Sequence, residues 1–291
     1  MKRSAVWMLL LVCGGRVQAT MIGVSGSGNV YHIDEATGLG TFVGSTGIGF
    51  PYIINSLARS PAGVYFSATD TSFPFPQSLF TIDPATGAGT IVASLSFGSV
   101  SPSIRALAFS PAGELYAIHN QGLLSSPNDL YLINPVTGAG TLAGSTGLCG
   151  IQSLTSSPTG LLYAWDFGCS GQTGLGLVTI NPLTGAAIDV NPAMGGGSMQ
   201  SLAFSAAGAL YGVNNNFVDG PGINPFYSIN TLTGEATTIG NGPYGYTDLR
   251  GLECITCPPV QPAAVPEPPA ITLLGAGCLA LVVARRMRRR H

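Results

Sequence analysis

Short apolar runs separated by turn residues recur along the chain from residue 20 to residue 257. Residues 104–147, for example, read IRALAFS, PAG, ELYAI, a variable loop, DLYLI, NPVTGAG and TLAGSTG. The four apolar runs of this stretch predict four short β-strands. The SPAG turn has a clear physical basis, because Pro fixes φ at its second position and the Gly accepts a positive φ. The pattern therefore predicts an all-β domain built from hairpins.

The same four-strand pattern returns at a nearly constant spacing, which indicates one structural unit used several times. Its first-strand element occurs as INSLARSPAG, IRALAFSPAG, IQSLTSSPTG, MQSLAFSAAG and the shorter LRGLEC. These copies begin at Ile54, Ile104, Ile151, Met199 and Leu249, with spacings of 50, 47, 48 and 50 residues. A second element, of the type NPVTG, places Asp34, Asp83, Asn134, Asn181 and Asn230 at equivalent positions. We expect these side chains to bond the backbone of their own turns rather than a metal ion, since the repeat supplies no partner carboxylate.

Four strands in about 49 residues are typical of a propeller blade, although a β-solenoid or a stacked sandwich can share that count. The two ends of the domain favour the propeller. Residues 21–47 supply strands two to four of a unit, and residues 247–254 supply strand one. Joining these fragments closes a ring and leaves no interblade face exposed. We therefore predict an all-β, five-bladed β-propeller over residues 20–257, with four-stranded blades and one blade assembled from both ends.

Composition supports this fold and excludes one class of partner. The 291 residues include 41 Gly and 21 Pro, and 8% are charged, which is typical of a turn-rich β-protein. Residues 20–264 contain twelve Asp and Glu against three Arg, a net charge of −9. Such a surface repels nucleic acid and anionic lipid, so we exclude nucleic acid as a partner.

Residues 1–19 have the pattern of a signal peptide. The positively charged start KR leads into the apolar run AVWMLLLV, and the small-residue pattern VQA stands before Thr20. We expect cleavage between Ala19 and Thr20 and export of the mature protein. Lipidation at Cys13 is the alternative, but Val12 stands where that processing requires Gly, Ala or Ser.

Three further segments follow the predicted domain. Residues 258–269 are rich in proline, so we expect an extended linker. Residues 270–284 are uncharged and apolar and predict a short transmembrane or sorting helix, and residues 285–291 predict a basic cytoplasmic tail. The apolar stretch is shorter than the roughly 20 residues of a stable span, which argues against a permanent anchor.

The order of these segments resembles the PEP-CTERM sorting signal. The motif VPEP, at Val265, Pro266, Glu267 and Pro268, is followed by the apolar stretch and the arginine cluster. The resemblance implies export in a Gram-negative bacterium, cleavage near the motif by an exosortase, and tethering to the inner membrane during sorting. It also implies a final place at the cell surface or outside it, associated with extracellular polysaccharide or biofilm. An ordinary single-pass anchor is the alternative, but it requires neither the VPEP motif nor so short a span.

Four cysteines lie in the predicted domain and are expected to pair, because an exported protein meets an oxidising compartment. Cys149 and Cys169 are equidistant from the hairpin turn at Thr159, so we expect a disulfide between them. Cys254 and Cys257 are expected to form a local disulfide after the last strand. Their spacing also occurs in redox and zinc sites, but neither a thioredoxin-like context nor a second pair of ligands accompanies it.

One polar position of the first-strand element is the candidate for ligand binding. It places five side chains at equivalent points near one mouth of the central channel, namely Asn55, Arg105, Gln152, Gln200 and Arg250. We expect these donors to contact an anionic or hydroxyl-rich ligand. The alternative is that they bond neighbouring blades and channel water, as buried polar groups usually do.

The aligned repeats provide little that is typical of catalysis. His119 and Asp166 are the available acid–base pairing near that mouth, and no third ligand or nucleophile accompanies them. The sequence therefore predicts no cofactor, no metal and a noncatalytic binding or scaffold protein. Because propellers also carry enzymes, a secreted lactonase or hydrolase remains the alternative.

Overall fold

A computed structural model describes residues 20–48, 52–70, 77–101, 103–120, 126–168, 175–190, 199–214, 224–242, 248–255 and 257. These residues form strands and turns, and within these ranges no helix is long and apolar enough to cross a membrane. The predicted signal peptide (1–19), linker (258–269), apolar helix (270–284) and basic tail (285–291) lie outside the described residues. The sorting motif lies outside them as well.

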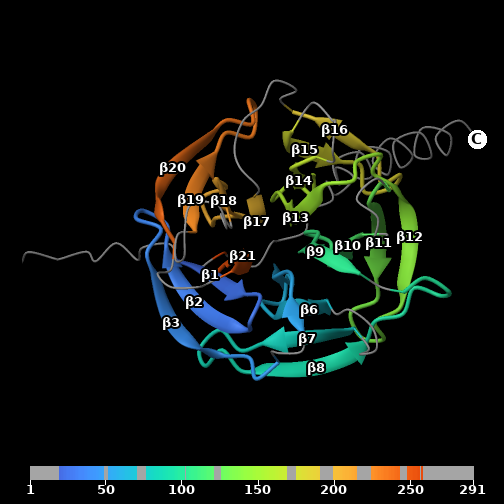
Figure 1. Cartoon of the computed structure of the whole chain (residues 1–291), viewed down its shortest axis with the longest axis horizontal. Coiled ribbons are helices and arrows are strands. Elements are labelled where there is room, and N and C mark those ends of the chain that lie inside the picture. Colours follow the sequence, from blue (N-terminus) through green and yellow to red (C-terminus); the bar gives the residue numbers. More distant parts are fainter. Residues whose placement is uncertain are drawn as a thin grey trace, which may run out of the picture. The chain divides into compact units, whose positions relative to one another are not determined.

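Five antiparallel sheets form a ring of blades around a central axis, and we use the word channel for the line of that axis between the innermost strands (Figure 1). From the channel outward, blade 1 contains β21 (Leu249–Cys254), β1 (Thr20–Ser25), β2 (Asn29–Asp34) and β3 (Gly40–Ser45). Blade 2 contains β4 (Ile53–Ile54), β5 (Ala58–Arg59), β6 (Tyr65–Asp70), β7 (Ser78–Ile82) and β8 (Gly89–Ser94). Blade 3 contains β9 (Ile104–Phe109), β10 (Leu115–His119), β11 (Asp129–Ile133) and β12 (Gly140–Ser145). Blade 4 contains β13 (Ile151–Ser156), β14 (Leu162–Asp166), β15 (Gly176–Ile180) and β16 (Ala187–Asp189), and blade 5 contains β17 (Met199–Phe204), β18 (Leu210–Asn214), β19 (Pro225–Ile229) and β20 (Ala236–Asn241).

Blade 1 closes the ring with strands from the two ends of the domain. β21 pairs with β1 in an antiparallel register that sets Met21 opposite Cys254 and Val24 opposite Gly251. Apolar side chains from both strands are fully buried, among them Met21, Ile22 and Leu252. The prediction of a five-bladed propeller closed by a strand near the C-terminus is confirmed.

Blade 2 differs from the predicted four-stranded unit because its innermost strand is divided. β4 and β5 both pair with β6, and Asn55 to Leu57 interrupt them. At the break, the Asn55 amide nitrogen bonds the Ala68 carbonyl oxygen at 3.3 Å. The side chain of Asn55 bonds Ile104 of blade 3 and Arg250 of blade 1, and the hydrogen bonding along β6 is irregular at this point.

The hydrophobic core consists of five clusters, one at each interface between neighbouring blades. Between blades 4 and 5, for example, Trp165 and Leu177 pack against Met199 and Leu202. Burial of this apolar surface requires each blade to have two neighbours, so ring closure and core formation are one event.

The turn after the third strand of a blade bonds itself and then docks on the preceding blade. Asn181 Oδ1, for instance, accepts the amide nitrogens of Leu183 at 2.9 Å and Thr184 at 3.3 Å. The predicted turn role of the five Asp and Asn residues is supported by equivalent bonds in every blade. The Thr184 carbonyl oxygen then lies so close to Gly144 of blade 3 that a Cβ there would overlap it.

Candidate functional site

The predicted ring of polar residues occupies one mouth of the channel, which we call the polar mouth, at the start of the innermost strands. In four blades the pairing register skips the polar residue, so a β-bulge stands at that position. The bulged residues are Arg105, Gln152, Gln200 and Arg250. A bulge turns a side chain out of the regular alternation of the strand. Asn55 takes the equivalent place in blade 2, directly after β4.

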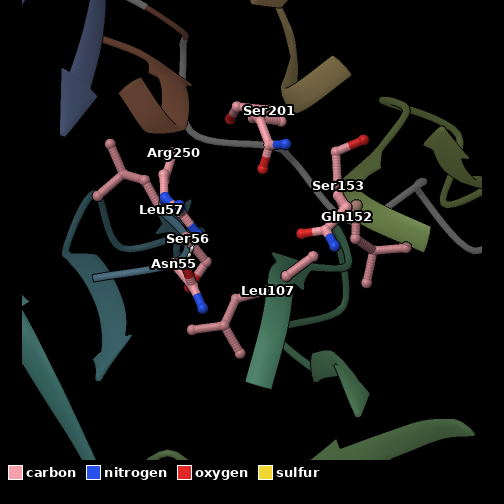
Figure 2. A pocket seen from close by; sticks show the side chains of 11 residues that line it. Asn55, Ser56, Leu57, Leu107, Gln152, Ser153, Ser201 and Arg250 are labelled. Carbon is pink, nitrogen blue, oxygen red and sulfur yellow. Dashed lines mark hydrogen bonds between the residues drawn. The ribbon is translucent and has the colours of Figure 1, made fainter. Parts of the chain in front are cut away.

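A small hollow lies between these strands; its volume is about 150 Å³ with its open mouth included, and its interior has room for about one water molecule. Polar residues of the ring line it from several sides, and Figure 2 shows Asn55 and Arg250 facing Gln152 across it. Arg105 is not part of its lining. The remaining lining residues are Ser56, Leu57, Ala106, Leu107, Ser153, Leu154, Gln200 and Ser201. The hollow is smaller than the roughly 300–1,000 Å³ of a typical ligand pocket, so it suits a small chemical group.

Arg250 joins blade 1 to blade 2 at this mouth. Its Nε donates to Asp248 Oδ2 at 2.6 Å, and its Nη1 donates to Asn55 Oδ1 at 2.8 Å. The guanidinium is therefore paired with a carboxylate and oriented by an amide. Its positive charge is largely neutralised within the protein.

Asp70, at the end of β6, joins blade 2 to blade 3. Its Oδ2 accepts from Asn55 Nδ2 at 2.9 Å and lies 3.4 Å from Arg105 Nη1. Its Oδ1 accepts from Gln77 Nε2 at 3.2 Å and from the Ser103 hydroxyl at 3.5 Å. Burial raises the pKa of Asp70, and the guanidinium groups of Arg105 and Arg250 oppose that rise. The polar ring thus forms a network across blades 1 to 3.

This network predicts a measurable coupling between Arg105 and Asp70. We expect the pair Arg105→Gln and Asp70→Asn to show a coupling energy of about 1 kcal/mol, because the ion pair is only partly exposed. Gln is a suitable replacement since it occupies the equivalent position in blades 4 and 5. Urea unfolding of both single variants and the double variant measures the coupling. Additive effects would show that the pair contributes nothing to stability.

A second set of polar residues lies where the second strand of each blade ends, and all of its members are buried. It comprises Ser25, Thr69, His119, Asp166 and Asn214. His119 Nε2 bonds the Ser101 carbonyl oxygen at 3.1 Å, and Asp166 Oδ1 accepts the Gly168 amide at 2.9 Å. Burial raises the pKa of Asp166, and the charge of Asp189 adds to the rise. His119 bonds the loop before β9, and its Nδ1 has no hydrogen-bond partner among the described residues, while Asp166 bonds its own loop, so no hydrogen bond joins this pair.

The opposite end of the channel contains a half-buried carboxyl group, Glu253, that the sequence did not indicate. We call this end the tight-turn mouth, because the turns between the first two strands of blades 2 to 5 lie there, such as residues 110–113. Glu253 Oε2 accepts the Arg59 amide at 3.1 Å, and Glu253 Oε1 accepts the Cys254 amide at 3.0 Å. Burial raises the pKa of Glu253 to about 7, against the effect of these two bonds and of the Arg59 charge. The other four copies of the first-strand element carry Ala or Thr at this position.

Cys254 and Cys257 form a disulfide next to this carboxyl group, with a Cα–Cα distance of 5.6 Å. The Tyr65 hydroxyl donates to the Cys254 carbonyl oxygen at 2.9 Å, which ties the end of β21 to blade 2. Cys149 is also disulfide-bonded, while Cys169, its predicted partner, lies outside the described residues. In the part of the chain that the structure describes, no three His, Cys, Asp or Glu side chains are grouped so that they could hold a metal ion.

No protein-family model matches the chain, and neither does any curated protein. Among solved structures, a chain of a nidogen/laminin complex is similar at a TM-score of 0.51 and 13% identity, covering 81% of this chain and 98% of that one. A TolB from Acinetobacter baumannii has a TM-score of 0.44 and 13% identity, covering 81% and 66%. A gluconolactonase from Xanthomonas campestris has a TM-score of 0.46 and 12% identity, covering 78% of each. At such identities the likeness shows the fold alone, and the chain is a β-propeller.

Proposed function

We propose that this protein is an exported, noncatalytic propeller that serves as a binding or scaffold module at the cell surface or in the extracellular matrix. In this proposal the signal peptide directs export, and an exosortase-type enzyme recognises Val265 to Pro268 and releases the protein from the inner membrane. The disulfide between Cys254 and Cys257 supports an oxidising destination. The sequence resemblance of the tail supports the sorting route.

The observation that carries the noncatalytic assignment is the pairing of charges at the polar mouth. Arg250 is held by Asp248 and Asn55, and Arg105 is held by Asp70. Both oxygens of Asp70 accept hydrogen bonds from protein donors. A general acid or base must direct a proton site at a reactant. The charged groups of Asp70, Arg105 and Arg250 instead bond other side chains of the protein, which favours a rigid binding surface.

A secreted enzyme of lactonase or hydrolase type is the second candidate, and Glu253 is the observation that favours it. A carboxyl group with a pKa of about 7 is suited to proton transfer near neutral pH. Backbone amides occupy both of its oxygens, however. We therefore interpret Glu253 as part of the ring closure.

The sorting proposal is tested by replacing VPEP with four alanines in the full-length chain, expressed in a Gram-negative host that carries an exosortase. We expect the original chain to appear at the surface or in the medium without its tail. The variant should stay in the inner membrane with its tail attached, because the arginine cluster holds the apolar segment there. A host that lacks the exosortase is the control. Equal processing of variant and original chain would contradict the proposal.

A further inference from the structure

The polar mouth offers hydrogen-bonding groups that the protein itself does not use. The side-chain amide of Gln152 faces the hollow from blade 4 (Figure 2). The hydroxyls of Ser56 and Ser153, which also line it, are buried and form no hydrogen bond within the described part of the chain. An amide side chain can donate and accept at once, and a hydroxyl can do the same. This combination suits a partner that also donates and accepts, such as an alcohol group.

The charge of the mouth disfavours an ionic ligand. Two guanidinium groups, of Arg105 and Arg250, are matched by the two carboxylates of Asp70 and Asp248. The four groups sum to zero at neutral pH. The surrounding domain is strongly acidic, with a net charge of −9 over residues 20–264. An anionic ligand would thus meet no free cation at the mouth and a repulsive field around it.

The size and the walls of the hollow limit what can enter. Its interior has room for about one water molecule, so a ligand can insert a single hydroxyl while the rest of the ligand stays at the open mouth. Leu57, Leu107 and Leu154 contribute apolar wall beside the amide and the hydroxyls. One hydroxyl of a larger ligand, placed against the Gln152 amide with the leucines beside it, matches this lining.

We propose that the hollow at the polar mouth takes one hydroxyl of an uncharged polyol, either a free sugar or the end residue of a neutral glycan, and discriminates against acidic glycans. This inference rests on the proposed extracellular binding function and names the ligand class for it. The side-chain amide of Gln152 has no hydrogen-bond partner among the described residues. It should favour ligands that bond it, because a polar site rejects a ligand that leaves its groups without partners.

The test is isothermal titration calorimetry on the exported, processed protein with defined probes. Glucose and mannose are the free sugars, gluco- and manno-oligosaccharides are the neutral glycans, and alginate and polygalacturonate oligosaccharides are the acidic ones. We expect binding of neutral probes and none of acidic probes. Binding of oligosaccharides alone would identify a glycan end, and equal binding of monosaccharides would identify a free sugar. Either result supports the ligand class.

Two variants at one position separate hydrogen bonding from charge. Gln152→Leu removes the amide at similar size and should weaken neutral binding at least about tenfold. Gln152→Arg places at the bulge a residue that blades 1 and 3 already carry there, but without a carboxylate partner, and should gain acidic binding. Thr141→Arg, on the exposed outer strand β12, adds the same charge elsewhere and should not. Unchanged thermal unfolding confirms that each variant is folded.

Tight binding of acidic probes by the original protein, or full neutral binding by Gln152→Leu, would overturn the inference. So would the absence of binding to every uncharged probe by a folded, exported protein, and this last result would leave the proposed surface location intact. Failure of the chain to leave the cell would instead overturn the proposed function, and the binding data would stand apart from it.

Discussion

Replacing Gly144 by alanine is expected to destabilise the domain by about 3 kcal/mol, with a decrease in Tm of about 6–12 °C. The reason is a backbone contact between blades. A Cβ at Gly144 would overlap the Thr184 carbonyl oxygen, and Gly185 of the same turn also lies against Gly144. Neither group is a flexible side chain, so blade 4 would have to move away from blade 3. Differential scanning calorimetry measures the effect.

Blade 2 provides a matched control for this substitution. Ala93 of β8 holds the position that Gly144 holds in β12, since Ala93 pairs with Leu79 as Gly144 pairs with Leu130. In blade 2 the turn of blade 3 approaches the Ser94 carbonyl oxygen instead, since a Cβ added at Gly138 of that turn would overlap this oxygen. We expect Ala93→Gly to cost only the roughly 0.5–1 kcal/mol of a glycine in a strand. A loss for Gly144→Ala no larger than that of the control would contradict the proposed docking of the turn.

Replacing Glu253 by glutamine is expected to remove about 2 kcal/mol of the stability that the domain loses between pH 5 and pH 8. At pH 5 the variant should be about 1–2 kcal/mol less stable than the original, because its one side-chain oxygen can accept only one of the two backbone amides that Glu253 accepts. The pKa of Glu253 is raised from 4.5 to about 7 in the folded protein. The folded state therefore holds a proton that the unfolded state has lost between these values, and stability decreases as pH rises through this window. The full shift corresponds to about 3 kcal/mol, and we reduce it because the residue keeps some exposed surface.

Thermal unfolding from pH 4.5 to pH 8.5 tests this expectation. Burial raises the pKa of Asp70 and Asp166 as well, so the slope should shrink in the Glu253→Gln variant and keep its sign. Glu235→Gln removes the same charge from an exposed turn and is the control. An identical pH dependence in the original protein and in Glu253→Gln would show that Glu253 carries no burial penalty.

The repeats were sufficient to predict the ring, since each copy of the first-strand element marks one blade and residues 21–47 complement residues 247–254. The break in the inner strand of blade 2 could not be predicted, because INSLARS has the same apolar pattern as the other copies. It becomes understandable only from the contacts of Asn55, whose amide and carbonyl groups bond Asp70 and Arg250. These contacts depend on tertiary geometry that local propensity does not contain.

The candidate site was predictable in part for a related reason. Equivalent repeat positions identified the five polar residues, and the bulges explain why these positions face the channel. Their partners Asp70 and Asp248 stand outside the repeated elements, so spacing alone did not indicate that the arginines are neutralised. Glu253 takes a position that is Ala or Thr in the other four copies, so the repeat pattern predicts a small side chain there and gives no sign of an acid.

The central claim is that this propeller binds and does not convert its ligand. The most direct measurement incubates the exported, processed protein with sugar lactones, esters and neutral oligosaccharides and follows the products by mass spectrometry. We expect every compound to be recovered intact, with neutral oligosaccharides retained by the protein in parallel binding experiments. Multiple-turnover release of a hydrolysed product, abolished by Glu253→Gln in a protein that remains folded, would contradict it and establish an enzyme.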